Sequence, residues 1–229
     1  MRHARQVNDH TDLLDPYITP DSIGSDGLGL SPIPLVPEIR LHLAEDAIVL
    51  RARLEAQSGT PLPPPFWADA WAGGQAVARY VLDHPEVVRG RRVLDVASGS
   101  GLVAIAAAMA GAETVIANDI DPYALAAIAL NARTNGVVID ISHDDLLDGV
   151  ADAEVVLAGD VFYNAPMAER MLSFLHRAAQ TGARVLVGDP GRTHLPHDRL
   201  DVVATYEVSM LGAPQDAQIN EVYVLELRD

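Results

Sequence analysis

Residues 92–101 read Arg-Val-Leu-Asp-Val-Ala-Ser-Gly-Ser-Gly, and this stretch predicts the fold class. An apolar run ends in a turn of small residues at 97–101, and a helix-like stretch follows at once at 102–110. A strand, a tight turn and a helix in this order present backbone N–H groups at the strand's C-terminal end, where α/β proteins bind ligands. Glycine in such a turn lets the main chain approach a ligand closely. The stretch therefore predicts an α/β protein with a ligand site at this turn.

The rest of the chain repeats the alternation of strand and helix. We expect further strands at 114–117, 138–141, 154–158 and 184–187, and helices at 75–83, 122–135 and 165–180. This order predicts a mostly parallel sheet with helices on both faces. The last two strands, about 200–209 and 219–227, have only a loop between them, so we expect them to pair as an antiparallel hairpin. Such a hairpin is absent from the nicotinamide-binding Rossmann pattern.

The segment before the repeat has a different character. Residues 1–37 are rich in Asp, Gly and Pro without clear periodicity, which predicts an extended or flexible arm. Alternating apolar residues at 39–43 predict a short strand, and 45–57 suits a strand or a helix. We therefore expect an N-terminal extension at 1–60 and one domain at 61–229. Prolines at 61–65 enforce an extended segment just before three aromatic residues, namely Phe66, Trp67 and Trp71.

Composition limits the partners and the compartment. The chain has 229 residues, no cysteine and a formal net charge of −16. The absence of cysteine excludes disulfides and thiolate metal sites, the histidines show no metal-ligand spacing, and a reducing compartment is favoured. The acidic balance argues against a nucleic-acid partner, because binding to phosphates needs a basic face. No apolar run is long enough to span a membrane, so we expect neither a transmembrane helix nor a membrane partner.

The first residues suggest where the protein acts. Arg2 and Arg5 are soon followed by Asp9, Asp12 and Asp15, which argues against a signal or transit peptide. We expect a cytoplasmic bacterial protein, or a mitochondrial matrix protein if this is a mature eukaryotic chain. No exposed apolar face stands out, so a monomer is expected.

Acidic residues follow four successive strands of the predicted sheet, namely Asp95, Asp119, Asp144 and Asp160. A carboxylate at the first strand end repels a pyrophosphate and attracts a ligand with positive charge and hydroxyl groups, such as S-adenosylmethionine. The second is placed to accept hydrogen bonds from ribose hydroxyls. The third, or its neighbour Asp145, is placed to accept the adenine amino group.

Apolar residues complete this expected nucleoside site. Ile120 and Leu146 are placed to sandwich the adenine ring. Each acidic residue taken alone also suits a helix cap or a turn. The pattern at 99–104 equally satisfies a dinucleotide-binding fingerprint that ends in Ala, with Asp119 on a nicotinamide ribose. Asp95 and the terminal hairpin favour S-adenosylmethionine over a nicotinamide cofactor.

Residues 160–163, Asp-Val-Phe-Tyr, form the candidate catalytic segment. A carboxylate beside two aromatic side chains suits a lysine: Asp160 would orient the amine, while Phe162 and Tyr163 would hold its alkyl stem and charge. A core aromatic pair with a capping Asp is the alternative. Residues 188–192, Gly-Asp-Pro-Gly-Arg, end the fifth strand. We expect a structural turn there, with Arg192 paired to Asp189 or meeting a substrate carboxylate.

Several segments together resemble a known family. They are Trp-Ala-Gly-Gly-Gln at 71–75, Arg-Tyr-Val-Leu at 79–82, Val-Leu-Asp at 93–95, Ala-Asn-Asp-Ile-Asp-Pro at 117–122, Gly-Asp-Val-Phe-Tyr at 159–163 and Gly-Asp-Pro-Gly-Arg at 188–192. Together they resemble the family 16 lysine methyltransferases, which belong to the seven-β-strand protein methyltransferases. The resemblance covers roughly residues 60–225, and also 36–41.

The resemblance implies a class I methyltransferase fold and methyl transfer from S-adenosyl-L-methionine to lysine ε-amines of a protein. The members that it resembles most modify the electron transfer flavoprotein β subunit, which implies that subunit as the substrate. It assigns the lysine site to Asp160, Phe162 and Tyr163. It assigns the cofactor site to Trp71, Asp95, Gly99, Ser100, Gly101, Asp119, Ile120 and Asp144. Ala97 stands where many methyltransferases have Gly, and we expect it to adopt an ordinary extended conformation.

Two other functions remain open at this stage. The segment 61–71 is suited to form a lid over a small pocket, as in a small-molecule amine N-methyltransferase. A non-catalytic module that binds the flavoprotein without modifying it is the second alternative.

Overall fold

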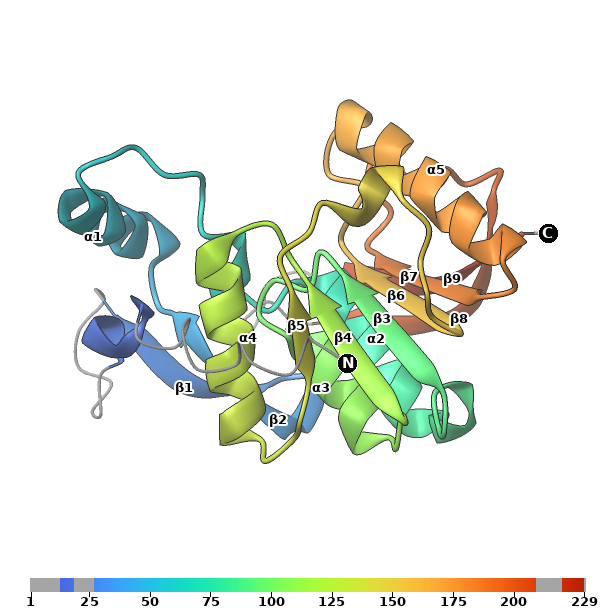
Figure 1. Ribbon diagram of the computed structural model, residues 1–229, viewed down its shortest axis with the longest axis horizontal. Helices are drawn as coiled ribbons and strands as arrows, with labels where there is room; N and C mark the ends of the chain where they lie inside the picture. The colour runs from blue at the N-terminus through green and yellow to red at the C-terminus, as the bar shows by residue number, and fades with distance from the viewer. Residues whose placement is uncertain (1–12, 19–26, 209–219, 229) are drawn as a thin grey trace, which may run out of the picture.

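The computed structural model describes residues 13–18, 27–208 and 220–228. Its main sheet has seven strands in the order β5-β4-β3-β6-β7-β9-β8 (Figure 1). Their bounds are β3 Arg92–Val96, β4 Thr114–Asn118, β5 Asp140–Ser142, β6 Val155–Gly159, β7 Arg184–Asp189, β8 Leu200–Val208 and β9 Asn220–Leu227. The first five are parallel, whereas β9 pairs antiparallel with both β7 and β8. The predicted parallel sheet with a C-terminal antiparallel hairpin is confirmed.

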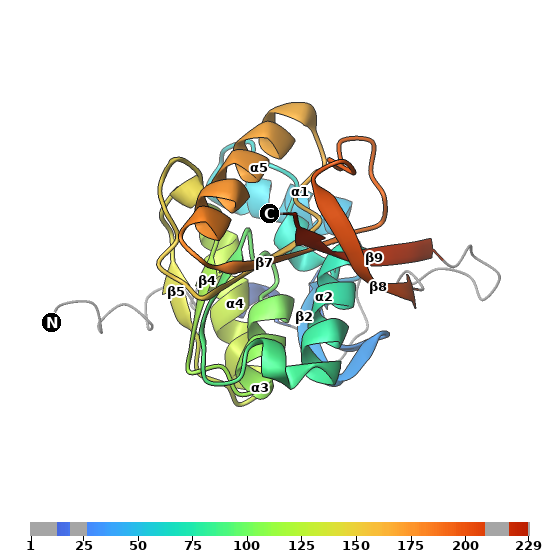
Figure 2. The same ribbon diagram turned by 90° about the vertical axis from the view of Figure 1, so that its right-hand side faces the viewer.

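Period-two alternation along the strands sends side chains to two separate cores. In β3, Val93 packs with the cluster that includes α2 (Ala72–Asp83), α3 (Leu102–Met109) and α4 (Pro122–Thr134). Its neighbour Leu94 packs with the cluster built on α5 (Ala165–Gln180). Figure 2 shows α5 on one side of the sheet and α2 and α3 on the other. The central strands are therefore buried on both faces, as a parallel sheet requires.

The N-terminal region holds more structure than the sequence predicts. A hairpin of β1 (Leu28–Ile33) and β2 (Val36–Ala44) precedes α1 (Ala47–Ser58), and a short 3-10 helix lies at Asp15–Tyr17. The expected strand at 39–43 is confirmed, and the ambiguous segment is a helix. The prediction of an arm is wrong for the described residues up to 37, because β1 pairs with β2. The remainder of that predicted arm lies outside the described residues.

This extension shares its core with the rest of the chain. Ile39, Leu41 and Leu43 of β2 are buried in the same cluster as α2 and α3. Helix α1 buries Leu50 and Leu54 in a third cluster that also contains residues of α4. In Figure 1 the hairpin accordingly lies beside α4, and α1 lies further out on the same side of the molecule.

Two element boundaries differ from the predictions in ways that affect the site. Helix α2 begins at Ala72 rather than at 75, so Gly73 and Gly74 form its first turn. Strand β5 covers only Asp140–Ser142, and Val138, expected inside that strand, is exposed. None of the helices in the described ranges has both the length and the apolar character needed to cross a lipid bilayer.

Candidate functional site

A cavity of about 540 Å³ opens at the C-terminal ends of β3, β4 and β6. Volumes of this order are typical of small-molecule and cofactor sites. The wall comes from the 63–71 segment, the ends of those three strands and the turns after them, the turns after β5 and β7, and helices α4 and α5. Its residues are Pro63, Pro64, Phe66, Trp67, Trp71, Val96, Ala97, Gly99, Asn118, Asp119, Ile120, Asp121, Ala124, Asp145, Leu146, Leu147, Gly159, Asp160, Val161, Tyr163, Met167, Arg170, Met171 and Arg192.

The turn after β3 has an unusual backbone. Gly99 has φ 56° and Gly101 has φ 84°, both in the left-handed region that glycine tolerates. Ala97 has φ 55°, so the expectation of an extended conformation there is wrong. A Cβ on Gly101 would lie 3.3 Å from Ile128 Cα, because α4 packs directly against the start of α3. The turn is therefore shaped by α4 as well as by its own glycines.

Asp119, after β4, both supports this turn and faces the cavity. Its Oδ2 accepts the Gly99 N–H at 2.9 Å and its Oδ1 accepts the Asp121 N–H at 3.0 Å. Burial raises the pKa of this carboxyl group. Ile120 next to it lines the cavity and is 66% exposed. Both predicted cofactor residues thus lie in the cavity wall.

Asp95 lies beneath the turn rather than in the cavity wall. Its Oδ2 accepts the Ser98 hydroxyl at 2.5 Å and the Ala104 N–H at 3.1 Å. Burial raises the pKa of the Asp95 carboxyl group to about 7. In this structure Asp95 connects the turn to the first turn of α3. Its predicted attraction for a positively charged ligand stays a prediction.

Three other predicted cofactor residues, Ser100, Gly101 and Asp144, also lie outside the cavity wall. The Ser100 carbonyl accepts the Asn131 side-chain N–H at 2.8 Å. The Asp144 carbonyl accepts the Asn118 Nδ2–H at 2.9 Å, which holds the ends of β4 and β5 together. Asp145 lines the cavity beside Leu146. Of the two carboxylates predicted for the adenine amino group, Asp144 and Asp145, it is therefore Asp145 that lies at the cavity.

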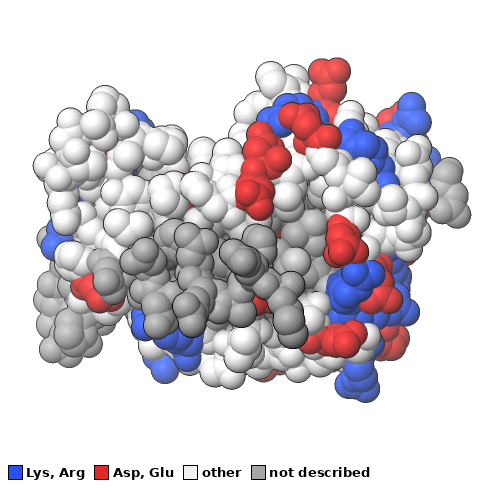
Figure 3. All heavy atoms as spheres, in the orientation of Figure 1, with Lys and Arg blue, Asp and Glu red and all other residues white. Residues whose placement is uncertain are grey.

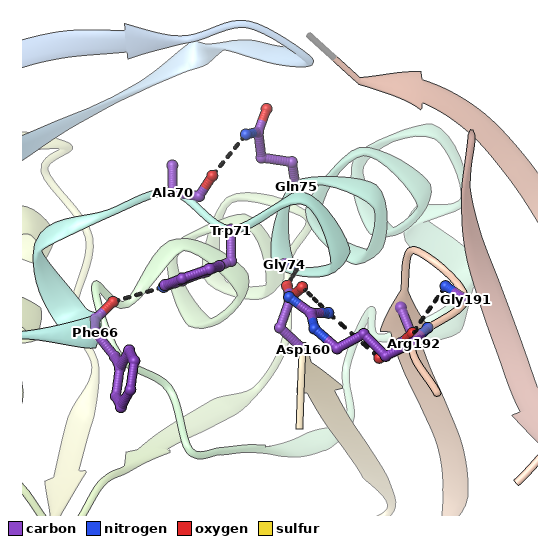
Figure 4. Close-up of polar contacts among 9 residues, drawn as sticks. Phe66, Ala70, Trp71, Gly74, Gln75, Asp160, Gly191 and Arg192 are labelled. Atoms are coloured by element: carbon purple, nitrogen blue, oxygen red, sulfur yellow. Dashed lines mark hydrogen bonds and ion pairs between the residues drawn. The ribbon is translucent and has the colours of Figure 1, made fainter. Parts of the chain in front are cut away.

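The candidate catalytic carboxylate, Asp160, has both oxygens engaged (Figure 4). Its Oδ2 accepts the Gly74 N–H at 2.8 Å, and its Oδ1 accepts the Arg192 Nη1–H at 2.5 Å. Asp160 has φ 61°, in the left-handed region that few residues other than glycine adopt. Burial raises the pKa of Asp160, and the neighbouring guanidinium opposes that rise.

The turn after β7 supplies this arginine. The expected turn is present: Asp189 Oδ1 accepts the N–H groups of Gly191 at 2.8 Å and Arg192 at 2.7 Å. The Arg192 guanidinium also lies 3.4 Å from Asp189 Oδ2, so the expected pair with Asp189 is confirmed. The shorter contact, with Asp160, joins the turn after β7 to the turn after β6.

Glycine contacts bring α2 against these strand ends. A Cβ on Gly73 would lie 2.2 Å from the Gly188 carbonyl oxygen, and a Cβ on Gly159 would lie 2.7 Å from Gly74 Cα. No larger residue fits at these crossings, so the glycines let the Gly74 N–H reach Asp160. The sequence shows the Gly-Gly pair at 73–74, but it does not show which strand ends, those of β6 and β7, the pair packs against.

Aromatic side chains lie differently from the prediction. Phe162 is fully buried and packs with α5, as the core alternative required, whereas Tyr163 is 51% exposed and lines the cavity. Phe66 lies between Tyr163 and Trp71, with ring centroids 6.0 Å from each. The Trp71 indole N–H donates to the Phe66 carbonyl at 2.7 Å. The cavity therefore has an aromatic trio, Phe66, Trp71 and Tyr163, where the sequence predicted Phe162 and Tyr163.

The residues present suit S-adenosylmethionine. Asp119 offers carboxylate oxygen to hydroxyl groups, and Ile120 and Leu146 offer apolar surface to a flat ring. Gly99 keeps the main chain close to the cavity without a side chain. Within the described residues, no group of three or more His, Cys, Asp or Glu side chains is arranged to hold a metal ion.

Comparison with known proteins agrees with this geometry. Residues 79–182 match the family model described as ribosomal protein L11 methyltransferase (PrmA). The electron transfer flavoprotein beta subunit lysine methyltransferase of Xenopus laevis is 40% identical over 185 residues, which are 77% of this chain and 74% of that protein. The protein of the same name from Danio rerio is 42% identical over 161 residues, which are 69% of this chain and 62% of that protein.

The solved structure of TrmN from Thermus thermophilus is similar in fold. It has a TM-score of 0.50 and 24% sequence identity, and the match covers 66% of this chain and 48% of that chain. The match to the family model and the named relatives establish a methyltransferase that uses S-adenosylmethionine, and the sheet order agrees with this. The chain belongs to the family of electron transfer flavoprotein β subunit lysine methyltransferases.

Proposed function

We propose that this protein methylates lysine ε-amines of the electron transfer flavoprotein β subunit. The observation that carries the proposal is one cavity whose wall includes Gly99 and Asp119, which we assign to the donor end, and Asp160 with the aromatic trio, which we assign to the acceptor end. The names of the most similar relatives support this substrate. Lysine has the long apolar stem and terminal amine that such an end would accommodate.

The donor end of the cavity binds and orients. S-adenosylmethionine, when bound, supplies a methyl group on a positively charged sulfur. Asp119 accepts hydrogen bonds from hydroxyl groups while its other contacts keep the glycine turn in place. Ile120 and Leu146 provide apolar surface and help to exclude water. Much of the catalytic effect of such a site comes from positioning the two reactants.

The acceptor end holds the amine. Phe66, Trp71 and Tyr163 present aromatic faces and edges to the lysine stem, and aromatic faces attract ammonium groups. The amine attacks only in its neutral form, so it leaves its proton to solvent before transfer. Asp160 accepts a hydrogen bond from the amine and thereby directs its lone pair. Burial of the site disfavours the charged amine and so assists this step.

Mass spectrometry tests the proposal directly. Unmodified electron transfer flavoprotein, from a host that lacks such an enzyme, is incubated with this protein and S-adenosylmethionine. The expected result is a mass gain in methyl steps on β-subunit lysines. No gain, with S-adenosylmethionine binding intact in calorimetry, would reject this substrate. Methylation of free amines in a parallel panel, without protein methylation, would indicate the small-molecule alternative.

A variant at the acceptor end tests the assigned site. Asp160→Ala is expected to reduce methyl transfer at least about 100-fold, because both the orientation of the amine and the contacts with Gly74 and Arg192 are lost. Asp201→Ala, which removes a surface pair with Arg228, is the matched control and is expected to keep full activity. A normal rate in Asp160→Ala, with unchanged unfolding, would contradict the role.

A further inference from the structure

The proposed reaction does not by itself explain why an arginine, Arg192, lies at the acceptor end. An ammonium group arrives at the acceptor end, yet a permanently charged guanidinium already lines the same cavity. Its side chain is 23% exposed, and its Nη1 lies 2.5 Å from Asp160 and 3.4 Å from Asp189. Its Cζ lies 6.0 Å from the centre of the Trp71 ring. Arg192 thus contacts both Asp160 and Trp71 at the acceptor end.

These contacts determine how much negative charge Asp160 presents. One oxygen faces the guanidinium and the other faces the positive end of α2 through the Gly74 N–H. Without Arg192, a buried carboxylate would face the arriving lysine with only the helix end to offset its charge. Such a carboxylate stabilises an ammonium group strongly, because opposite charges within about 4–6 Å favour the charged form.

An ammonium group held in that way cannot react. The neutral amine attacks with its lone pair: the N–C bond forms, the donor's C–S bond breaks, sulfur keeps the electron pair, and the positive charge passes to nitrogen. No proton moves in this step, so Asp160 has no need to accept one. A carboxylate that bound the ammonium tightly would therefore oppose the step that precedes methyl transfer, namely deprotonation.

We propose that Arg192 is a positioning residue that pairs with Asp160, so that the acceptor lysine stays in the site as the neutral amine. The inference rests on the proposed lysine methylation and adds a residue to it. Asp160 then acts as a hydrogen-bond acceptor for an amine rather than as the partner of an ammonium group. Because Arg192 pairs with Asp160, the turn at 188–192 is held against the end of β6.

Other charged groups around the cavity remain the same in the test variants. Asp189 faces Arg192 from the end of β7, and Asp119, Asp121 and Asp145 line the cavity. Two further groups that bear on the acceptor end come from α5 and from the turn after β6. Arg170 pairs with Asp145 and Asp148, and burial raises the pKa of the Tyr163 hydroxyl. A difference between variants at Arg192 therefore reports that side chain.

The test is the pH dependence of kcat with saturating flavoprotein and S-adenosylmethionine. The rate rises with pH as the bound amine loses its proton, and the midpoint reports groups of the enzyme–substrate complex. Arg192→Met removes the charge, so the midpoint is expected to move about 1 pH unit to higher pH. Arg192→Lys keeps a charge without the planar geometry of the guanidinium, so it is expected to keep the midpoint while lowering the maximal rate.

A variant of Asp160 gives the opposite sign. Asp160→Asn leaves Arg192 facing the amine without the carboxylate, so the midpoint of its residual activity is expected to move to lower pH. The double variant is expected to return towards the wild-type midpoint, because the two opposite charges are removed together. A merely structural role for Arg192 predicts lower rates with no movement of the midpoint in either direction.

Controls separate this inference from loss of fold and from the proposed function. Arg184→Met breaks another part-buried pair, between the start of β7 and Glu226 of β9 at 2.8 Å, and is expected to leave the midpoint unchanged. If Arg192→Met does not fold, Arg192→Gln and the Asp160→Asn variant carry the test. A wild-type midpoint in every soluble variant would overturn the inference. Absence of methyl transfer by the wild-type enzyme would instead overturn the proposed function.

Discussion

At the scale of single residues, several side chains at the strand ends both order the backbone and shape the site. Asp119 faces the cavity while accepting two backbone N–H groups. Ala97 and Asp160 adopt positive φ angles, which cost conformational energy that the surrounding packing must offset. Asp95 is buried and does not line the cavity, so it acts on the site only by holding the turn in place.

Asp95 gives a pH-dependent prediction. Burial raises the pKa of Asp95 to about 7 in the folded state, whereas the unfolded chain has the ordinary value near 3.8. Between these values the folded protein keeps a proton that the unfolded chain releases, so this group's contribution to stability is lost as the pH rises towards 7. The unfolding free energy of wild type therefore falls as the pH rises from 4 to 8, whereas that of Asp95→Asn lacks this fall. The difference between the two proteins is expected to change by on the order of 3 kcal/mol, in favour of the variant.

Urea unfolding of both proteins at pH 4 and pH 8, without S-adenosylmethionine, measures this difference. Asp201→Asn, which alters a surface pair with Arg228, controls for the loss of one negative charge. A difference between Asp95→Asn and wild type that stays constant across this range would show that Asp95 has no raised pKa in the folded state.

At the scale of elements, the site depends on how α2 crosses the ends of β6 and β7. The crossing is closer than side chains allow, since a Cβ on Gly188 would lie 2.0 Å from the Gly73 carbonyl oxygen. This approach places the first turn of α2 over Asp160 and places Trp71, its N-cap, in the cavity wall. The Trp-Ala-Gly-Gly-Gln and Gly-Asp-Pro-Gly-Arg segments are thus two sides of one contact.

Gly188→Ala tests this contact. The added methyl group must displace backbone, so the unfolding free energy is expected to fall by about 1–3 kcal/mol. Methyl transfer is expected to fall at least about tenfold in the folded fraction, because α2 and the Gly74 N–H move away from Asp160. Gly29→Ala is the control, since a Cβ there meets nothing within 4 Å. Equal activity of the two folded variants would argue against the role of this crossing.

At the scale of the whole molecule, the N-terminal extension is part of the folded unit that carries the site. The buried Gln75 side chain accepts the Leu35 N–H of the hairpin at 3.4 Å and donates to the Ala70 carbonyl at 2.7 Å. The boundary predicted at residue 60 therefore separates segments that share one core. On the face shown in Figure 3, acidic and basic side chains lie interspersed rather than in one basic stripe. Cellular location and oligomeric state stay predictions.

Deletion of residues 1–60 tests this integration. The hairpin buries five large apolar side chains in the main core: Ile33, Val36, Ile39, Leu41 and Leu43. At about 1.5–3 kcal/mol each, their loss approaches the total stability of an ordinary domain. The truncated chain is therefore expected to lose cooperative thermal unfolding, and Leu41→Ala in the full chain to lose about 2–5 kcal/mol. Val138→Ala, at an exposed site, serves as the control. Cooperative unfolding of 61–229 near the wild-type temperature would show an independent domain.

The sequence by itself determined the fold class, the order of strands and helices, the glycine turn and the line of strand-end carboxylates. These follow from period, turn chemistry and chain order, which are local properties. Only the tertiary structure decided that Phe66 and Trp71 join Tyr163 while Phe162 is buried, that Ala97 is left-handed, and that Arg192 holds Asp160. The Gly74–Asp160 bond joins residues 86 positions apart, and no local pattern encodes which surfaces meet across such a distance. Which surfaces meet is decided by the packing of α2, α4 and α5 against the sheet, because each of these helices must bury its apolar face.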